Sequence, residues 1–551
     1  MTPPSSLALD SSTVRQDLDY DWLVVGSGFG GSVAALRLAE KGYRVGLIEA
    51  GRRITDDDMP RSTWDVKRYF WAPKLGLKGI FRLTLFRDVA VVSGAGVGGG
   101  SLGYANTLYR APDRFYRDPQ WAGIEDWATA LAPHFDTAER MLGVVTVTAD
   151  DPADQLLREF GREIGAEQTY AKTRVGVYFG TPGETVADPF FGGEGPARTG
   201  CIACGRCMVG CPHNAKNTLP KNYLWLAERA GATITPERTV VDVRPLGAPD
   251  GSDGYAVTTE RTGAWLRRDR RVHTSRGVVV AAGPLGTNKL LAHAKLSGAL
   301  PRISHRLGEL VRTNSEAILA VTLPKGAEDM TKRVAISSSV YPDPDTHIET
   351  VTYGAAGDSI SGMFTLLVGD GTRLTRPLKL IGALLRHPLR FARITWPRGW
   401  SRRTVIVLVM QSLDNAIALR AKQTRRGVRL QTEQDPERPN PTFIPVANQF
   451  ADWLAERTGG IAQSGLTEAA ANIPTTAHIL GGAVIGASSA DGVIDGRQRV
   501  FGYENLLVCD GSAIPANVGV NPSLTITALA EHAMSHIPAA GARREPARAA
   551  A

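Results

Sequence analysis

The sequence predicts an α/β fold with two domains, one organised around a βαβ unit near the N-terminus and the other built on an antiparallel sheet. Trp22–Val25 is typical of a strand buried on both faces, and it enters a glycine-rich turn followed by helical spacing over Ser32–Lys41. Between residues 308 and 474 the pattern changes to short alternating strands, which favours an antiparallel sheet. Because 551 residues exceed the length at which one hydrophobic core keeps growing, we expect two domains.

The glycine-rich turn has the spacing of a dinucleotide-binding fingerprint, G-x-G-x-x-G. Gly26 makes the tight turn, Gly28 lets a pyrophosphate approach the backbone, and Gly31 lets the helix pack close to the strand. Tyr43–Ile48 is the expected second strand, and Glu49 stands at its carboxyl end, where a carboxylate accepts hydrogen bonds from an adenosine ribose. This carboxylate would repel a 2′-phosphate, so the pattern predicts a Rossmann-like domain for FAD or NAD rather than NADP.

A second glycine cluster lies between Ala90 and Asn106. Residues without side chains let the backbone approach a bulky planar or phosphorylated ligand. Valines and leucines flank the cluster closely, which distinguishes it from a flexible linker. We therefore predict that the cluster binds the cofactor through Gly96, Gly98, Gly99, Gly100 and Ser101.

Three later stretches complete a recognisable set of motifs: GVVVAAGPLGTNKLL at 277–291, HILGG at 478–482 and LLVCDGSAIPANVGVNPSLTITALAEH at 506–532. With the two glycine motifs, they resemble the glucose–methanol–choline (GMC) flavin oxidoreductases, and most of all the cholesterol-oxidase-like actinobacterial branch. The resemblance spans residues from about 21 to 537 and is weakest in the middle. It implies FAD as the cofactor, and oxidation of the hydroxyl of a 3β-hydroxysterol or another apolar alcohol to a carbonyl.

The resemblance also implies roles for residues near the C-terminus. His478 occupies the position of the family's catalytic histidine in H-x-x-G-G and would accept the hydroxyl proton while the hydride passes to flavin N5. Asn521 matches the family's second polar partner and would hydrogen-bond the substrate oxygen. The backbone of Val241 would lie against the adenine, and Asp510 with Gly511 would meet the ribityl chain.

Sterol oxidases of this kind also use a glutamate to move a double bond from Δ5 to Δ4. Three acidic residues remain open for that role in this chain: Asp414, Glu316 and Glu349. Two alternatives to a sterol oxidase also remain. One is a dehydrogenase of another apolar alcohol that passes electrons through an iron–sulfur cluster to a partner, and the other is a non-catalytic electron-transfer flavoprotein.

Four of the five cysteines form the pattern C-x2-C-x2-C-x3-C-P, with Cys201, Cys204, Cys207 and Cys211. This is the spacing of a bacterial ferredoxin loop and predicts an iron–sulfur cluster. Structural zinc more often uses two C-x2-C pairs separated by a longer loop, and a loop without metal is the third alternative. Four thiols this close together are prone to oxidation without a metal.

The cysteine loop leaves the electron acceptor open between oxygen and an electron-carrier protein. The well-known secreted cholesterol oxidases lack this loop, whereas some GMC dehydrogenases carry a cysteine-bound cluster that takes electrons from the flavin. We expect Arg198, Arg206 and Lys216 to form a basic surface that docks an acidic carrier.

Two segments mix basic with apolar residues, Trp64–Arg87 and the stretch between Asp370 and Asp414, which contains nine Lys or Arg and no acidic residue. Such segments suit an anionic membrane surface, although packing on the protein's own sheet is the alternative. No run approaches 18 consecutive apolar residues and no signal peptide is recognised, so a cytoplasmic protein with peripheral membrane contact is expected. The net charge of +8 is spread along the chain without a nucleic-acid-binding motif, so no nucleic-acid partner is predicted.

The motifs divide the chain into alternating segments. The expected segments are FAD-binding at 18–110, a substrate or cap segment at 111–200, the cysteine loop with more FAD-binding chain at 201–307, the substrate-binding domain at 308–474, and FAD-binding chain with the catalytic residues at 475–537. The N-terminal leader and the tail at 538–551 are expected to be disordered.

Overall fold

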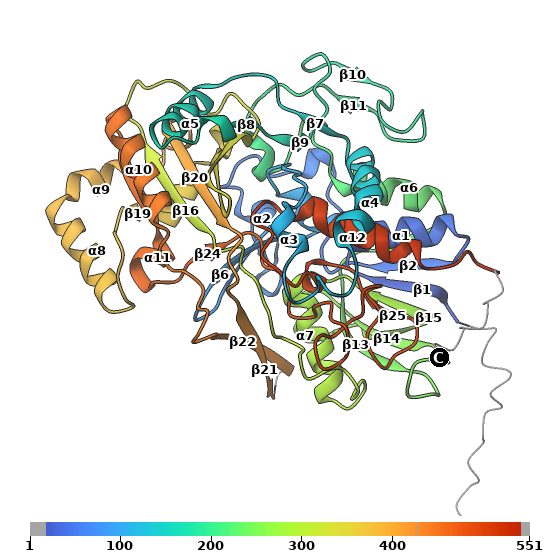
Figure 1. The fold of residues 1–551 in the computed structure, drawn as a ribbon. Helices are drawn as coiled ribbons and strands as arrows, with labels where there is room; N and C mark the ends of the chain where they lie inside the picture. Colours follow the sequence, from blue (N-terminus) through green and yellow to red (C-terminus); the bar gives the residue numbers. More distant parts are fainter. Residues whose placement is uncertain (1–17, 426, 542–551) are drawn as a thin grey trace, which may run out of the picture.

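The computed structural model describes residues 18–425 and 427–541, and it has the predicted mixed α/β architecture (Figure 1). The first sheet has the order β12-β2-β1-β15-β14-β13, and β25 also pairs with β15. β12, β2, β1, β15 and β25 run parallel, whereas β13, β14 and β15 form an antiparallel meander. The strands are β1 (Tyr20–Val25), β2 (Val45–Ile48), β12 (Thr233–Thr235), β13 (Arg238–Pro245), β14 (Tyr255–Arg261), β15 (Arg271–Val280) and β25 (Leu506–Val508).

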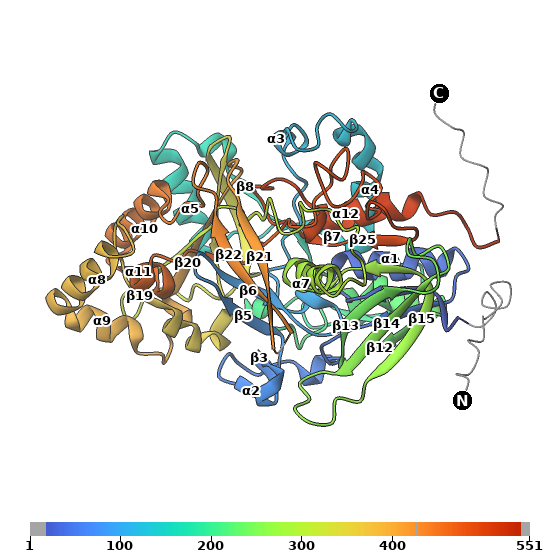
Figure 2. The same ribbon diagram turned by 90° about the horizontal axis from the view of Figure 1, so that it is seen from below.

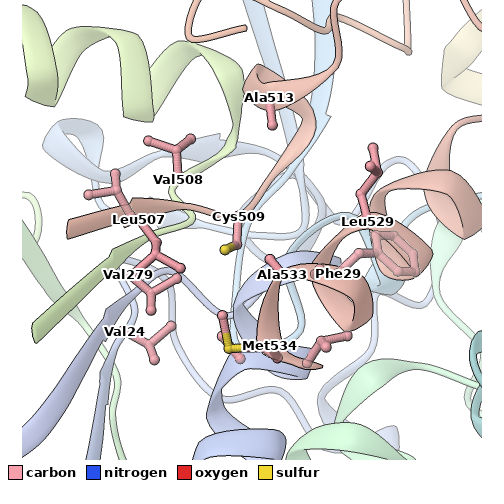
Figure 3. Packing of buried hydrophobic residues seen from close by; sticks show 14 of the residues in the cluster. Val24, Phe29, Val279, Leu507, Val508, Cys509, Ala513, Leu529, Ala533 and Met534 are labelled. Carbon is pink, nitrogen blue, oxygen red and sulfur yellow. The ribbon is translucent and has the colours of Figure 1, made fainter. Parts of the chain in front are cut away.

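Helices cover this sheet, which explains the uninterrupted apolar runs of its strands. Figure 3 shows Val24, Val279 and Leu507 from three parallel strands packed near Ala533 and Met534 of a helix. α1 packs against α12 and α6, and α12 also packs against α4, whereas α7 packs against β13. The helices are α1 (Phe29–Glu40), α4 (Trp127–Leu142), α6 (Tyr223–Arg229), α7 (Gly283–Leu296) and α12 (Ser523–Ser535).

The second sheet is antiparallel throughout, as predicted, in the order β19-β23-β16-β20-β18-β17-β8. Alternate residues of β20 belong to two different cores: Val405, Val407 and Val409 pack with α5 and α10, whereas Ile406 and Leu408 face the other way. The elements are β8 (Ala171–Lys172), β16 (Ala317–Thr322), β17 (Ile336–Asp343), β18 (Thr346–Val351), β19 (Phe364–Leu366), β20 (Thr404–Gln411), β23 (Ile461–Gly465), α5 (Pro152–Glu163) and α10 (Pro445–Thr458).

Smaller elements lie outside the two large sheets. They are β3 (Trp71–Ala72), β4 (Leu77–Lys78), β5 (Phe81–Leu85), β6 (Ala90–Gly94), β7 (Val144–Thr146), β9 (Arg174–Gly176), β10 (Thr185–Val186), β11 (Arg198–Thr199), β21 (Ile417–Thr424), β22 (Gly427–Gln434), β24 (Thr475–Thr476), α2 (Val66–Tyr69), α3 (Asp113–Tyr116) and α11 (Leu466–Ala471). α8 (Thr375–Arg386) and α9 (Pro388–Thr395) form a hairpin at the end of the molecule farthest from the parallel sheet (Figures 1 and 2). Within the described ranges, no helix is long and apolar enough to cross a membrane.

The prediction of disorder from residue 538 onward is wrong for its first residues. The Ala540 N–H donates to the Lys41 carbonyl at 2.8 Å, and the Tyr43 hydroxyl donates to the Pro538 carbonyl at 2.9 Å. These bonds hold the chain against the end of α1. The N-terminal leader and residues 542–551 lie outside the described residues.

Candidate active site

A cavity of about 1420 Å³ lies between the two sheets. Most ligand sites measure about 300–1,000 Å³, so this cavity has room for a cofactor and a second molecule. The first residues of three helices line it: Gly30 of α1, Gly283 of α7 and Ser523 of α12. Helix N-termini carry partial positive charge and unpaired N–H groups, so this arrangement favours an anionic ligand.

Eight of the twelve predicted cofactor-binding residues line the cavity: Gly26, Gly28, Glu49, Gly99, Gly100, Val241, Asp510 and Gly511. The other four lie behind its wall and shape it. A Cβ on Gly31 would stand 2.0 Å from the Gly26 carbonyl oxygen, so Gly31 permits close packing, as predicted. Gly96 and Gly98 have positive φ, and the Ser101 hydroxyl donates to the Gly98 carbonyl at 2.7 Å.

Glu49 holds the two glycine loops in place. Its carboxylate accepts hydrogen bonds from the Ser27 N–H at 3.0 Å, the Ser27 hydroxyl at 2.7 Å and the Gly51 N–H at 2.7 Å. The Ser27 hydroxyl in turn accepts from the Gly98 N–H at 3.0 Å. Glu49 therefore organises the turn in addition to lining the cavity at the end of β2. Ser27 links the two loops, a role that the glycine pattern did not indicate.

Asp510 is engaged mainly with protein groups. One carboxylate oxygen accepts from the Gly283 N–H at 2.9 Å and the Thr287 hydroxyl at 2.5 Å, and the other accepts from Ser512. Burial raises the pKa of Asp510, and these hydrogen bonds oppose that shift. Asp510 thus fixes the end of β25 to the start of α7. The backbone around Gly511, which lines the cavity, is the part of this segment that can contact a ligand.

His478, which is partly exposed to the cavity, forms a hydrogen-bonded pair with the buried Glu316. Nδ1 of His478 lies 2.5 Å from one carboxylate oxygen of Glu316, which also accepts from the Thr476 hydroxyl at 3.1 Å. The other oxygen accepts from the Ala477 N–H at 2.8 Å. Because the carboxylate accepts a hydrogen bond, the proton of a neutral imidazole stands on Nδ1, and Nε2 keeps a lone pair. Glu316 was one of three candidates for isomerisation, but its oxygens are occupied in orienting His478.

Asn521 and Glu349 stand on the other side of His478. The Asn521 side-chain nitrogen lies 3.5 Å from His478 Nε2 and 3.5 Å from a Glu349 carboxylate oxygen. The second Glu349 oxygen is buried without a hydrogen-bond partner among the described residues. Burial, together with the nearby charge of Glu316, raises the pKa of Glu349 to about 8. The third candidate, Asp414, is half exposed and instead pairs with Arg312 at 2.9 Å and Arg438 at 2.7 Å.

The lining of the cavity that holds His478 and Asn521 also includes a set of apolar side chains. They are Ile80, Phe81 of β5, and Ile336, Val351 and Leu408 of the antiparallel sheet, and they belong to one packed cluster. An apolar ligand would therefore be held with a polar group directed at His478 and Asn521.

The residues present fit FAD. The glycine backbones and helix N-termini suit its diphosphate, and the carboxylate of Glu49 at the end of β2 suits the adenosine ribose. β13 changes register between Val240 and Asp242, so the backbone of Val241 leaves the β13–β14 ladder where it lines the cavity.

Comparisons with known proteins agree with this geometry. Residues 404–530 match the family described as GMC oxidoreductase, and residues 24–56 match the NAD(P)-binding Rossmann-like domain. A cholesterol oxidase of Mycobacterium tuberculosis (strain ATCC 25618 / H37Rv) is 50% identical over 543 residues, covering 96% of this chain and 93% of the relative. The chain belongs to the GMC oxidoreductase family. It is an FAD-dependent oxidoreductase that acts on CH–OH groups, which confirms FAD over NAD.

A second relative supports this assignment, and a solved structure supports the fold. A cholesterol oxidase of Acinetobacter baumannii is 46% identical and covers 95% of each chain. The crystal structure of pyridoxine 4-oxidase from Mesorbium loti aligns with a TM-score of 0.59 at 14% identity, covering 94% of this chain and 99% of that one. The latter likeness concerns the fold alone.

The four cysteines of the predicted metal site lie outside the lining of the large cavity. Cys201, Cys204, Cys207 and Cys211 line a separate small cavity. In the described part of the chain, no group of three or more His, Cys, Asp or Glu side chains is arranged to hold a single metal ion. The predicted basic docking surface is wrong, because Arg198 and Lys216 are both 1% exposed.

The raised pKa of Glu349 predicts a pH dependence of stability. Between its ordinary pKa of 4.5 and its folded value of about 8, the folded protein keeps a proton that the unfolded chain has lost. The free energy of unfolding therefore falls as pH rises through this window, with a contribution of at most about 1.4 kcal/mol per pH unit. Glu349→Gln should remove this contribution, as measured by denaturant unfolding at several pH values.

The exposed Glu433 on β22 supplies a matched control. Glu433→Gln should keep the pH slope of the unmodified protein. Equal slopes for the Glu349→Gln variant and the unmodified protein would show that Glu349 is ionised in the folded state.

Proposed function

We propose that this protein oxidises the hydroxyl of a 3β-hydroxysterol, or of a similarly apolar alcohol, to a carbonyl. The observation that carries the proposal is the pair His478 and Asn521, which lines the same cavity as the predicted cofactor-binding residues and the apolar set. The name cholesterol oxidase, borne by the two most similar relatives described above, supports the sterol and also oxygen as the electron acceptor.

Each site residue has a separate role in the proposed reaction. FAD, when bound, supplies the acceptor for the hydride that leaves the carbinol carbon. His478 accepts the hydroxyl proton at Nε2, and Glu316 stabilises the resulting positive charge through Nδ1. The Asn521 amide donates a hydrogen bond to the substrate oxygen and fixes its position. The apolar walls exclude water from the reacting groups.

The proposal predicts that cholesterol, mixed anaerobically with the FAD-loaded protein, bleaches the oxidised flavin. His478→Gln should slow this bleaching by about 10²-fold or more while FAD stays bound, because general-base help is of that size. Rapid-mixing absorbance gives the rate, and flavin released by heat gives the FAD content.

The control is His305→Gln, since His305 is exposed and is not part of the cavity lining. No bleaching with any sterol or long-chain alcohol would contradict the proposed function. Loss of FAD together with activity in the His478→Gln variant would mean that His478 serves the fold instead.

Glu349 is the residue that we assign to the Δ5→Δ4 isomerisation. It lies beside Asn521, and the group orienting His478 is a different carboxylate, Glu316. A pKa of about 8 keeps the carboxyl near the operating pH, where a group can both take and return a proton most effectively. Glu349 would take a proton from the carbon beside the new carbonyl and return it to the far end of the double bond.

This assignment predicts a change of product. With cholesterol as substrate, Glu349→Gln should accumulate the Δ5 ketone, whereas the unmodified protein releases the conjugated Δ4 ketone. Chromatography of the extracted sterols, with ultraviolet detection of the conjugated product, distinguishes the two. A Glu349→Gln variant that still forms the Δ4 ketone at the unmodified rate refutes the assignment.

The sterol, we propose, is reached at an anionic lipid surface through the α8–α9 hairpin. Leu378 and Leu385 are 66% and 79% exposed on α8, and the exposed cations Lys379, Arg386 and Arg390 lie beside them. Arg376, by contrast, is buried and pairs with Glu468 at 2.5 Å, so it anchors the hairpin and cannot face lipid.

The second basic apolar segment adjoins this hairpin. The Arg373 guanidinium, just before α8, pairs with Asp88 at 2.6 Å and donates to the Arg87 carbonyl at 3.0 Å. Leu83 and Leu85 of the neighbouring β5 are exposed. Exposed leucines beside cations suit the interface of an anionic bilayer, where leucines enter the lipid and cations meet the headgroups.

We predict that the FAD-loaded protein sediments with vesicles containing phosphatidylserine, and less so at high salt. The double variant Leu378→Glu/Leu385→Glu should bind at least about 10-fold more weakly, because burial of each leucine contributes about 1.5–3 kcal/mol. Leu296→Glu, at a leucine 52% exposed near the end of α7, is the control and should bind like the unmodified protein. Equal binding by all three proteins would exclude the hairpin as the contact.

A further inference from the structure

The four cysteines of the C-x2-C-x2-C-x3-C pattern surround a cavity that the sterol reaction does not use. All four are free thiols of intermediate exposure, and they approach the cavity from one loop. The remaining wall includes three basic side chains, and no Asp or Glu from the described residues joins them. The lining residues are Val177, Cys201, Ile202, Cys204, Gly205, Arg206, Cys207, Cys211, His213, Ala215, Lys216 and Arg333.

The two arginines of this wall have unused hydrogen-bond donors. Arg333 is 4% exposed, and its Nη1 donates to Ser337 at 2.8 Å and Thr350 at 3.1 Å. Its Nε and Nη2, and the Nε of Arg206, find no acceptor in the part of the chain that the structure describes. A buried donor without an acceptor costs about 1–3 kcal/mol. A cavity with cations, unpaired donors and thiols therefore favours an occupant that is anionic and accepts hydrogen bonds.

A single zinc ion fits this geometry poorly. Its four thiolates would lie at about 2.3 Å from the ion, and hence only about 3.8 Å from one another. Within the described ranges, no three potential ligands converge in that way. A cluster of several irons and sulfides is wider, so its cysteines stand farther apart than the ligands of a single ion.

We propose that Cys201, Cys204, Cys207 and Cys211 bind one [4Fe–4S] cluster. The spacing and the following Pro212 are those of a ferredoxin loop. In ferredoxins with two clusters the fourth cysteine of this pattern ligates the other cluster. Here Cys211 lines the same cavity as the first three, so all four cysteines serve one site and a four-iron cluster is favoured over a three-iron one.

The cluster site shares a wall with the FAD cavity. Cys207 lines the small cavity and the next residue, Met208, lines the large one. Lys216, in the small cavity, lies 4.6 Å from the ring centroid of Tyr104, which lines the large cavity. Ile202 on the same loop is exposed, so the cluster also approaches the protein surface.

Because the site lies beside the FAD cavity, it offers the electrons of the reduced cofactor an acceptor other than oxygen. Oxidation of one alcohol releases two electrons and two protons. A cluster held by these cysteines would supply a one-electron acceptor beside the cofactor and a donor to an external one-electron carrier, and the two protons would go to solvent. The electron source rests on the proposed function, but the presence of the cluster does not.

The site is tested on the full-length protein, purified without oxygen. We expect about four irons and four acid-labile sulfides per chain, as a [4Fe–4S] cluster requires. Dithionite should produce an electron paramagnetic resonance signal of a reduced cluster. Fewer than about one iron per chain after anaerobic reconstitution with iron and sulfide, or one zinc per chain, overturns the proposal.

Variants then assign the ligands. Cys204→Ser should lose most of the iron while keeping FAD, and its reduced flavin should be reoxidised by a one-electron dye at least about 10-fold more slowly. Cys509→Ser is the control, because Cys509 is buried in the core of the parallel-sheet domain. Full iron content in Cys204→Ser refutes this ligand set. If cholesterol fails to reduce the flavin, the proposed function is refuted. The iron and sulfide assays still test independently whether the cluster is present.

Discussion

Close approach of the backbone around the first glycine turn is the constraint on which the rest of the structure depends. A Cβ on Gly30 would stand 1.7 Å from the Cys509 carbonyl oxygen, and a Cβ on Gly99 would stand 2.9 Å from the Gly28 Cα. Three stretches far apart in the sequence can meet there only because side chains are absent. These contacts form a cavity wall made of backbone. They also fix the end of β25, from which the chain continues towards Asn521.

Contacts between the two domains are also needed to position the catalytic residues His478 and Asn521. Glu316 enters from the chain just before β16, whereas His478 follows the antiparallel-sheet domain in the sequence. Asn314 strengthens these contacts: its N–H donates to the Asn517 side chain, and its side chain accepts from the Gly519 N–H, both at 2.8 Å. The loop that carries Asn521 is thus held by the same segment that orients His478, so both catalytic groups keep one geometry.

Sequence composition alone did not predict which basic residues are exposed and which are buried. Arg198 and Lys216 were expected to form a basic surface, and Arg376 belongs to the basic apolar stretch between Asp370 and Asp414, yet each of the three is almost completely buried. Arg376 is compensated by Glu468, and Lys216 by the carbonyls of Leu102, Tyr104 and Cys207 at 2.8–3.0 Å. A one-dimensional count cannot distinguish a solvated cation from a buried one, because the partners lie tens to hundreds of residues away.

The sequence by itself determined the local structural elements and motifs of this protein. They are the βαβ unit with its glycine turn, the helix Ser523–Ser535, the alternating strands of the second sheet and the cysteine spacing. Each depends on residues close together in the chain. Only the tertiary structure decided which of Glu316, Glu349 and Asp414 meets His478, which glycines line the cavity, and that all four cysteines face one space beside it. Those outcomes depend on long-range packing, which brings together groups that no local pattern connects.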